Sequence, residues 1–225
     1  MNFEIVCPNC GALSSPAVGV CPYCKSAMTT DTEKQVPTLT TIKTLYSDGK
    51  TDKALLLAKD LETQQPELLK NVDFALLYAN ILFEVDGPSS KIKAILGQAF
   101  TSNPSNAQVT EYLDVVDAES NLTDEPNDAG EQMLVQIVRR SPENVYALFF
   151  LGSHLYWVEK DAQKSLRYLE QCVRLRPNFI RAKACLAAVY KALNMNDAAS
   201  RLLDECAAKA SDKNTKEFFK NFAQS

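Results

Sequence analysis

Four prolines divide most of this chain into segments of similar length. The 225-residue sequence places Pro66, Pro104, Pro142 and Pro177 at intervals of 38, 38 and 35 residues, and the apolar residues between them recur at helical spacing. Proline cannot continue an α-helix, so each of these positions marks the end of one. A segment of this length holds two helices and the turn between them. The spacing therefore predicts a stack of helical hairpins from Thr38 onward.

The first segment shows the hairpin pattern most clearly. Gly49 lies in the expected turn, Ala54 falls where two helices touch closely, and Leu61 and Pro66 follow near the end of the second helix. A side chain larger than alanine at position 54 would push the two helices apart. The fourth segment has the matching residues Leu151, Gly152, Tyr156, Ser165, Tyr168, Cys172 and Pro177. Over roughly four fifths of the chain, the pattern resembles the tetratricopeptide repeat, a hairpin of about 34 residues.

The expected fold of the helical part is all-α, a tetratricopeptide-like α-solenoid of about five hairpins closed by a capping helix. The hairpins are predicted at residues 38–64, 70–102, 107–140, 144–175 and 178–210, and the capping helix at 213–223. Residues 29–37 are polar, lack apolar periodicity and are predicted to form a linker. The predicted domains are therefore 1–28, 29–37 and 38–225.

The resemblance implies a concave face, lined by the first helix of each hairpin, that binds a peptide or helix of a partner protein. Transferred to the matching positions, this groove comprises Phe74, Leu77, Tyr78, Ile81, Tyr112, Val115, Glu119, Phe149, Ser153, Tyr156, Trp157, Arg181, Ala188 and Lys191. A shift of one residue in helical register exchanges groove and core positions, so core packing stays open for each aromatic residue. Tyr156 and Trp157 are adjacent and cannot both point into one core, so at least one must reach a surface.

Two pairs of cysteines precede the hairpins. Cys7 and Cys10 form one C-x-x-C pair, and Cys21 and Cys24 form the second after ten intervening residues. Four thiolates on two tight turns can close a tetrahedron around one zinc ion and leave no open coordination position. The pairs, each with a proline after its first cysteine, resemble the short zinc ribbons of bacterial and archaeal proteins. We therefore expect one structural Zn²⁺ at these cysteines and a zinc ribbon over residues 1–28.

Other uses of the four cysteines stay open. Iron binding or a redox role would use the same thiolates, and a disulfide framework would suit an oxidising compartment. The N-terminal residues show no basic segment followed by an apolar one, which favours a cytoplasmic protein. The ribbon carries only Glu4 and Lys25 as charged residues, too few cations for strong phosphate binding. A transcription-associated regulator whose ribbon engages nucleic acid is the alternative function.

Charge differs strongly between the two halves of the helical part, although the net formal charge of the chain is only −4. Residues 31–138 hold 8 basic and 18 acidic residues, whereas residues 139–225 hold 15 basic and 9 acidic ones. Such polarity can orient a charged partner during association, and solvated helix faces would account for it equally well. The basic residues around Pro177, a candidate contact for an anionic group, are Arg174, Arg176, Arg181 and Lys183.

Catalytic chemistry finds little support in the sequence. His154 is the only histidine, and no thiol or carboxylate stands at a triad or ligand spacing from it. No apolar run approaches the ~18 residues of a membrane span. We therefore predict a non-enzymatic, cytoplasmic adaptor that binds partner proteins through the groove, with the zinc ribbon as a second interaction module. The oligomeric state does not follow from the sequence.

Overall fold

The computed structural model describes residues 5–6, 13–14, 38–210 and 213–224, and the chain divides into two units, Met1–Thr38 and Leu39–Ser225. In the first unit, strand β1 (Ile5–Val6) pairs antiparallel with strand β2 (Leu13–Ser14). The four cysteines of the predicted zinc ribbon, and the predicted linker, lie outside the described residues. The zinc site therefore stays a prediction.

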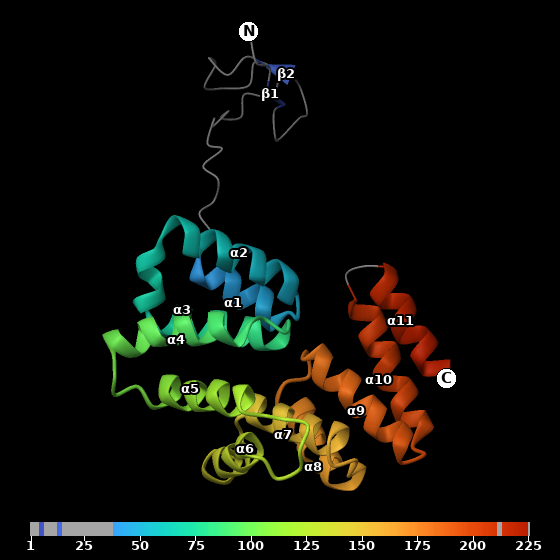
Figure 1. Ribbon diagram of the computed structural model, residues 1–225. Coiled ribbons are helices and arrows are strands. Elements are labelled where there is room, and N and C mark those ends of the chain that lie inside the picture. Colours follow the sequence, from blue (N-terminus) through green and yellow to red (C-terminus); the bar gives the residue numbers. More distant parts are fainter. Residues whose placement is uncertain (1–4, 7–12, 15–37, 211–212, 225) are drawn as a thin grey trace. The chain divides into compact units, whose positions relative to one another are not determined.

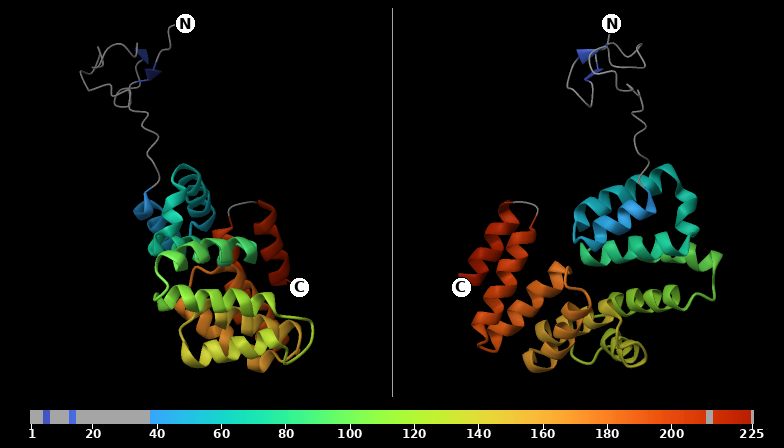
Figure 2. Two further views of the ribbon diagram at one scale, coloured as in Figure 1. Left: turned by 60° about the vertical axis from the view of Figure 1, so that its left-hand side comes forward. Right: turned by 180° about the vertical axis from the view of Figure 1, so that it is seen from behind.

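The second unit is an all-helical, tetratricopeptide-like solenoid, shown from three sides in Figures 1 and 2. Its hairpins are α1 (Leu39–Ser47) with α2 (Thr51–Gln64), α3 (Val72–Glu84) with α4 (Ser89–Ser102), α5 (Ala107–Ser120) with α6 (Ala129–Arg140), α7 (Val145–Trp157) with α8 (Ala162–Leu175), and α9 (Ile180–Ala192) with α10 (Asn196–Lys209). Helix α11 (Lys213–Gln224) packs against α10. The five predicted hairpins and the terminal helix are confirmed.

A short 3₁₀ helix, η1 (Pro66–Lys70), was not expected from the sequence. Proline supplies the fixed φ angle that suits the first turn of a helix, so Pro66 begins a new element as well as ending α2. Helix η1 packs against both α3 and α4. It therefore covers part of the second hairpin that a simple repeat would leave open.

Each hairpin turn contains one residue with left-handed backbone geometry. These residues are Gly49 (φ 75°), Asp86 (φ 60°), Asn127 (φ 56°), Lys160 (φ 57°) and Asn194 (φ 59°). Glycine adopts this conformation without strain, and asparagine and aspartate tolerate it better than other residues do. The turns that join the two helices of each hairpin are thus encoded locally, with Lys160 as the least favourable choice.

Side-chain caps begin several of the helices. Asn71, Asn106, Asp128, Asn144 and Asp161 each accept a hydrogen bond from the backbone N–H three residues later. Such a cap satisfies one of the N–H groups that lack a partner at a helix N-terminus and contributes ~1 kcal/mol. The helix starts are therefore fixed by individual polar residues in the sequence.

Small residues let the two helices of a hairpin approach closely. A Cβ atom on Gly152 of α7 would lie 2.8 Å from Cγ of Leu169 on α8. The buried Ser165 hydroxyl donates to the Gly152 carbonyl oxygen at 2.7 Å across the same contact. Ala54, which the sequence placed at the close contact of the first hairpin, is fully buried. The predicted role of small residues at these positions is confirmed.

The turn between α8 and α9 reaches back to the start of the solenoid. Arg176 donates from Nη2 to the backbone oxygen of Tyr46 at 3.0 Å, and Arg181 donates from Nη1 to that of Phe83 at 2.9 Å. These oxygens lie at the C-terminal ends of α1 and α3, where carbonyl groups lack helical partners and cations are favoured. Both arginines therefore make contacts within the solenoid that the sequence alone did not indicate.

The hydrophobic core is continuous from α1 to α9, and a second, smaller cluster joins the last helices. Its buried members are Ala187, Ala199, Leu203, Cys206, Ala207 and Phe219. Phe219 is the contribution of α11, so this helix is attached chiefly through one aromatic side chain and its neighbours. In the part of the chain that the structure describes, no helix is both long enough and apolar enough to cross a membrane.

Candidate functional site

Two aromatic residues divide the face formed by the first helices of the hairpins. The ring of Phe83 lies 4.4 Å from Tyr146 and 6.0 Å from Phe150, centroid to centroid. The ring of Phe179 lies 6.0 Å from Tyr146 and 4.8 Å from Phe149. We call Phe83 and Phe179 the aromatic wall. Tyr146 lines a hollow on one side of it, Phe149 and Phe150 line a second hollow on the other, and the two linings share no residue.

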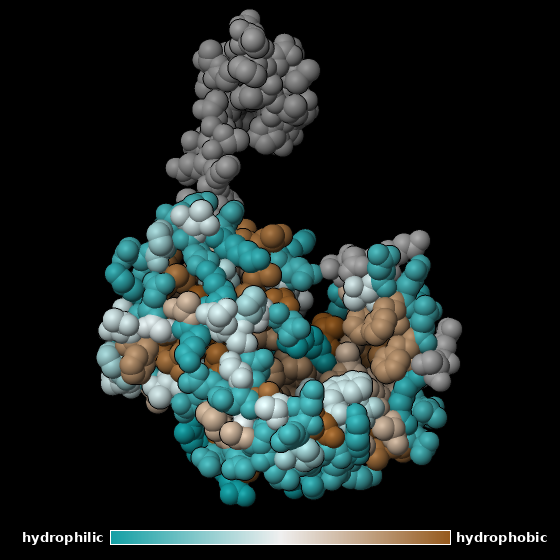
Figure 3. Space-filling view, viewed as in Figure 1, coloured by the Kyte–Doolittle hydropathy of each residue, from teal (hydrophilic) through white to brown (hydrophobic). Residues whose placement is uncertain are grey.

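The second hollow, which we call the apolar groove, has a volume of about 640 Å³ and lies among α7, α9 and α11. Its lining residues are Phe149, Phe150, Ser153, Trp157, Arg181, Ala184, Cys185, Ala188, Phe218 and Phe222. Figure 3 shows hydrophobic surface gathered on α11, beside the hollow that separates it from the earlier helices. The groove is thus a concave surface built almost entirely from apolar side chains.

Two large aromatic side chains of the groove are mostly exposed. The exposed fraction is 57% for Trp157 and 62% for Phe218. The Trp157 ring rests on the Tyr156 ring, at 4.6 Å between centroids. Tyr156 is in turn held by a hydrogen bond of 3.3 Å from its hydroxyl to the Ala188 carbonyl oxygen. Exposed aromatic residues that are held in place by their neighbours are the usual anchors of protein interfaces.

Helix α11 contributes to both the core and the groove. Phe219 is buried in the second hydrophobic cluster, whereas Phe218 and Phe222 stack on each other at 6.1 Å and line the groove. The sequence predicted only that this helix covers the end of the solenoid. Two of its three phenylalanines, Phe218 and Phe219, are adjacent and lie about 100° apart around the helix, so both cannot point squarely into one core. That spacing was the available signal for a second apolar surface.

The groove has a basic residue in its lining and another at its rim. Arg181 is the one charged residue that lines it in the described part of the chain. Its guanidinium group lies 5.1 Å from the Phe149 ring and pairs with Asp86 at 2.6 Å. Burial lowers the pKa of Arg181, but the group stays protonated because its ordinary value is so high. Nζ of Lys191 lies 5.0 Å from the Phe222 ring and adds a second cation at the rim.

A smaller hollow of about 380 Å³ continues from the groove past Trp157. It shares Phe150, Ser153 and Trp157 with the groove and extends to the turn between α5 and α6. His154 also lines it and is itself buried, with Nε2 at 3.6 Å from Oε2 of Glu131. His154 is therefore a packed helix residue. Trp157 stands where the two hollows meet.

The residues predicted to form one continuous groove are distributed over several environments. Phe149, Ser153, Trp157, Arg181 and Ala188 line the apolar groove. Tyr156 and Lys191 lie beside it. Tyr112 lines the hollow on the other side of the aromatic wall. The Glu119 carboxylate accepts a hydrogen bond of 2.5 Å from the Ser89 hydroxyl, between α4 and α5, and belongs to neither hollow.

Five predicted groove residues are buried and line none of the hollows described in this section. These are Phe74, Leu77, Tyr78, Ile81 and Val115. Four of them belong to α3, which is apolar on nearly every side and is covered along its length. Helices α2, α4 and η1 pack on it, and Arg181 in the first turn of α9 bonds to the Phe83 carbonyl oxygen at its C-terminal end. The first helix of the second hairpin is therefore a core helix and offers no groove.

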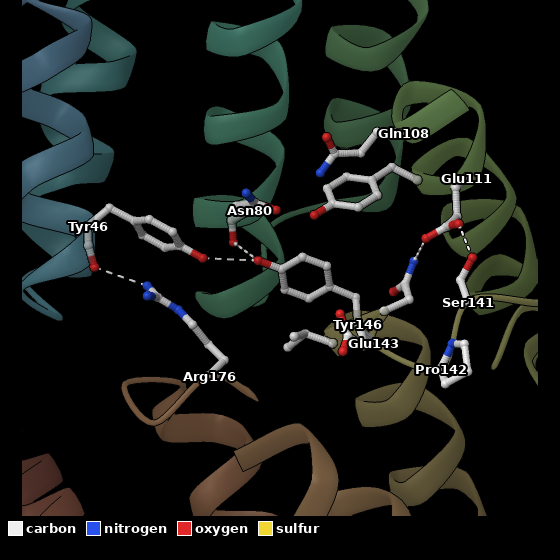
Figure 4. A pocket seen from close by; sticks show the side chains of 12 residues that line it. Tyr46, Asn80, Gln108, Glu111, Ser141, Pro142, Glu143, Tyr146 and Arg176 are labelled. Atoms are coloured by element: carbon white, nitrogen blue, oxygen red, sulfur yellow. Dashed lines mark hydrogen bonds between the residues drawn. The ribbon is translucent and has the colours of Figure 1, made fainter. Parts of the chain in front are cut away.

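The first hollow, which we call the polar compartment, has a volume of about 680 Å³ and lies among α1, α3, α5 and the start of α7 (Figure 4). Its lining residues are Tyr46, Asn80, Gln108, Glu111, Tyr112, Ser141, Pro142, Glu143, Asn144, Val145, Tyr146 and Arg176. Tyr46 and Tyr146 form its buried floor, and Gln108, Pro142 and Glu143 are exposed at its mouth. Except for Tyr112, no residue of this compartment was singled out from the sequence as a groove residue.

No family model and no curated protein matches the sequence. Solved structures of tetratricopeptide repeat proteins are similar to it, among them TTC0263 of Thermus thermophilus, at 16% identity over 85% of this chain and 98% of that one, with a TM-score of 0.47. A protein of Parabacteroides merdae is 9% identical over 83% of this chain and 70% of that one, with a TM-score of 0.49. YrrB, described as a TPR protein with an unusual peptide-binding site, is 14% identical over 81% and 90% of the two chains, with a TM-score of 0.39.

Proposed function

We propose that the protein is a non-enzymatic interaction scaffold whose apolar groove binds a segment of a partner protein. The segment is a helix or extended peptide that presents two or three large apolar side chains with an acidic residue beside them. The observation that carries this proposal is the exposure of Trp157 and Phe218, from two different helices, on one concave apolar surface. Exposed apolar surface of this kind on a folded domain marks a binding site.

The chemistry of the groove supports this partner. Its apolar lining favours aliphatic and aromatic side chains, which gain ~25 cal/mol for each Å² removed from water. Arg181 in the lining and Lys191 at the rim favour a carboxylate next to those side chains. At Trp157 the groove meets the smaller hollow that reaches the turn between α5 and α6. The bound segment can therefore extend past Trp157 toward that turn.

Selection of short peptides from a random displayed library against the whole chain tests this proposal. We expect the selected peptides to combine large apolar residues with aspartate or glutamate. Trp157→Ala and Phe218→Ala should each weaken their binding at least ~10-fold, as for central interface aromatics. Leu56→Ala is the matched control, because Leu56 is 65% exposed on α2 and lines none of the hollows described above.

Two results would contradict this assignment. Selected peptides rich in basic residues would show that the charge argument is wrong. Peptides that bind Trp157→Ala and Phe218→Ala as tightly as the unchanged protein would place their site elsewhere. The same variants also apply to partners recovered by affinity purification at native expression, where loss of a partner from both variants and not from Leu56→Ala is expected.

The cysteine pairs belong to a second part of this proposal. Cys7, Cys10, Cys21 and Cys24 would hold one structural zinc ion in a ribbon that contacts a second protein. The pairing of β1 with β2 supports it, since these strands bracket the segment that contains the first C-x-x-C pair. Metal analysis should give about one zinc per chain, lost in Cys7→Ser. Iron in place of zinc, or no metal with reduced cysteines, would contradict it. Salt-dependent binding of RNA or DNA by the whole chain, abolished in Cys7→Ser, would favour the nucleic-acid alternative.

A further inference from the structure

We propose that the polar compartment is a second binding site, which takes the cationic side chain of a lysine or arginine from a partner protein. It is independent of the apolar groove, since the aromatic wall separates the two and their linings share no residue. The argument rests on which polar groups of the compartment are already engaged and which are left to meet a ligand.

The one cation of the compartment is already neutralised. Arg176 donates from Nε to Oε1 of the buried Glu84 at 2.7 Å, and its guanidinium group stacks over the Tyr46 ring at 3.8 Å. The Tyr46 hydroxyl donates to the same carboxylate oxygen at 2.5 Å. Arg176 also donates to the Tyr46 carbonyl oxygen. An anionic ligand would therefore meet a guanidinium group that already pairs with a buried carboxylate of its own protein.

The remaining charges of the compartment are negative. The Glu111 carboxylate accepts from the Ser141 hydroxyl and, at 2.6 Å, from Nδ2 of Asn144, which holds it in place (Figure 4). Neither donor carries a charge, so the negative charge of Glu111 is kept. Glu143 adds a second carboxylate at the exposed mouth. These two carboxylates give the compartment a potential that attracts a cation.

A buried hydrogen-bond acceptor borders the compartment. Oδ1 of Asn80 is buried and has no donor among the residues that the structure describes. A buried acceptor without a donor is unfavourable, so a ligand whose N–H group reaches it gains that interaction. An ammonium or guanidinium group has such donors and no acceptor. The unpaired acceptor and the two carboxylates therefore all favour a ligand that carries a positive charge and N–H donors.

Aromatic rings complete the surroundings that a cation prefers. The rings of Tyr112 and Tyr146 meet edge to face at 5.6 Å and both line the compartment. A cation near a tyrosine ring is attracted by the negative charge on the ring face, and the attraction is stronger when water is excluded. Burial raises the pKa of Tyr112 to about 12 and holds that of Tyr146 well above its usual value, so both stay neutral at physiological pH. The volume of about 680 Å³ holds the side chain and its flanking backbone.

Titration of the whole chain with three capped amino acids tests the proposal. The probes are the N-acetyl methylamides of lysine, arginine and norleucine, followed by the NMR signals of the tyrosine rings. We expect saturable binding of the lysine and arginine probes and none of norleucine, which has nearly the same shape as lysine without the charge. Equal binding of norleucine, or binding of no probe, would overturn the proposal.

Variants of the compartment locate the binding. Glu143→Gln and Asn80→Leu should each weaken binding of the lysine probe at least fivefold. Glu125→Gln, a control at an exposed residue of the acidic half, should leave this binding unchanged. Equal losses in Glu143→Gln and Glu125→Gln would mean general attraction and no site. Asn80→Asp keeps the shape of the side chain and should tighten binding, which tests the acceptor should Asn80→Leu fail to fold. Trp157→Ala should leave binding of the lysine probe unchanged. The proposal for the compartment can therefore fail independently of the proposal that the apolar groove binds a peptide.

Discussion

The polar compartment and the apolar groove lie on opposite sides of the same aromatic wall, yet they are built in different ways. In the compartment, side chains from distant repeats bond to one another, as in the contacts of Arg176 with Glu84 and Tyr46. In the groove, neighbouring helices present apolar side chains, and Trp157 and Phe218 remain mostly exposed. One surface is held together by long-range polar contacts and the other by its own helices.

Helix α7 shows how one element serves both surfaces. Val145 and Tyr146 in its first turn line the compartment, while residues from Phe149 to Trp157 line the groove. The difference between the two arises from what faces α7. At its start, the first hairpins are tied to the turn between α8 and α9, whereas its end faces α9 and α11, which pack through a small separate cluster. A repeat array can therefore divide one concave face into surfaces of opposite character.

Of the changes that distinguish the compartment from the groove, breaking the Arg176 contact should lower the free energy of unfolding most. Arg176→Met keeps the apolar stem over Tyr46 but leaves the Glu84 carboxylate, whose side chain is 2% exposed, without its cation. Removing one partner of a buried ion pair costs about 3–5 kcal/mol. We expect a loss of that size in the free energy of unfolding, measured in urea, together with loss of the compartment.

The double variant Arg176→Met with Glu84→Leu is the control for this experiment. It removes both charges, so most of the lost stability should return. Equal destabilisation of the single and the double variant would show that the guanidinium matters only for its packing. Binding of selected peptides to the groove should persist in the double variant, because neither residue lines that surface.

Loosening α11 should affect the groove and spare the compartment. Phe219→Ala removes the one aromatic side chain that α11 buries in the second cluster, and substitutions of this kind cost about 3–5 kcal/mol in a well-packed core. Hydrogen exchange of the α11 amides should accelerate strongly while that of α3 stays unchanged. Phe218→Ala is the matched variant: its side chain is exposed, so stability should change by less than ~0.5 kcal/mol while peptide binding is lost. Faster exchange throughout the chain would mean that α11 is not a separate cooperative element.

The hairpins could be predicted from the sequence because their determinants are local. Asn71, Asn106 and Asn144 start helices through hydrogen bonds to residues three positions away, and Gly49 forms a turn through its own backbone. Apolar periodicity then indicates which side of each helix is buried, since a helix with one apolar face must bury that face. None of these signals depends on residues far along the chain, so the predicted boundaries match the observed helices closely.

The binding surfaces could be predicted only in part, because they depend on contacts between distant residues. Periodicity cannot orient α3, which is apolar on almost every side, and one of the contacts at its C-terminal end comes from Arg181, which bonds to Phe83 from 98 positions later. The last repeats were predicted better, since Phe149 and Trp157 keep the orientation that the repeat pattern gives them. Phe218 and Phe222 were missed because the terminal helix was treated only as a cover for the core.

Alkaline pH should weaken the compartment through its three tyrosines, none of which has a counterpart in the groove lining. Burial raises the pKa of Tyr112 to about 12, and burial likewise raises the pKa of Tyr46 and Tyr146. An unfolded tyrosine loses its proton near pH ~10, so above that pH the unfolded state is favoured. Each such tyrosine should therefore lower the free energy of unfolding by up to ~1.4 kcal/mol per pH unit above pH ~10, in addition to the loss from the buried Cys172, Cys185 and Cys206, whose pKa burial also raises. Tyr112→Phe should reduce this slope, and an unchanged slope would exclude Tyr112 as a contributor.

The smallest expected effect concerns Lys160, in the turn between α7 and α8 directly after the groove residue Trp157. Lys160 has a φ of 57° and is exposed, and its Nζ donates to the Trp157 carbonyl oxygen. Glycine avoids a left-handed strain of about 1–2 kcal/mol but loses more backbone entropy on folding, by about 0.5–1 kcal/mol. Lys160→Gly should therefore raise the free energy of unfolding by about 0.5–1 kcal/mol, and Asn194→Gly by less because asparagine tolerates this geometry. If Lys160→Gly also leaves peptide affinity unchanged, the groove depends on the Trp157 side chain and not on the turn that follows it; a loss of affinity would show that this turn positions Trp157.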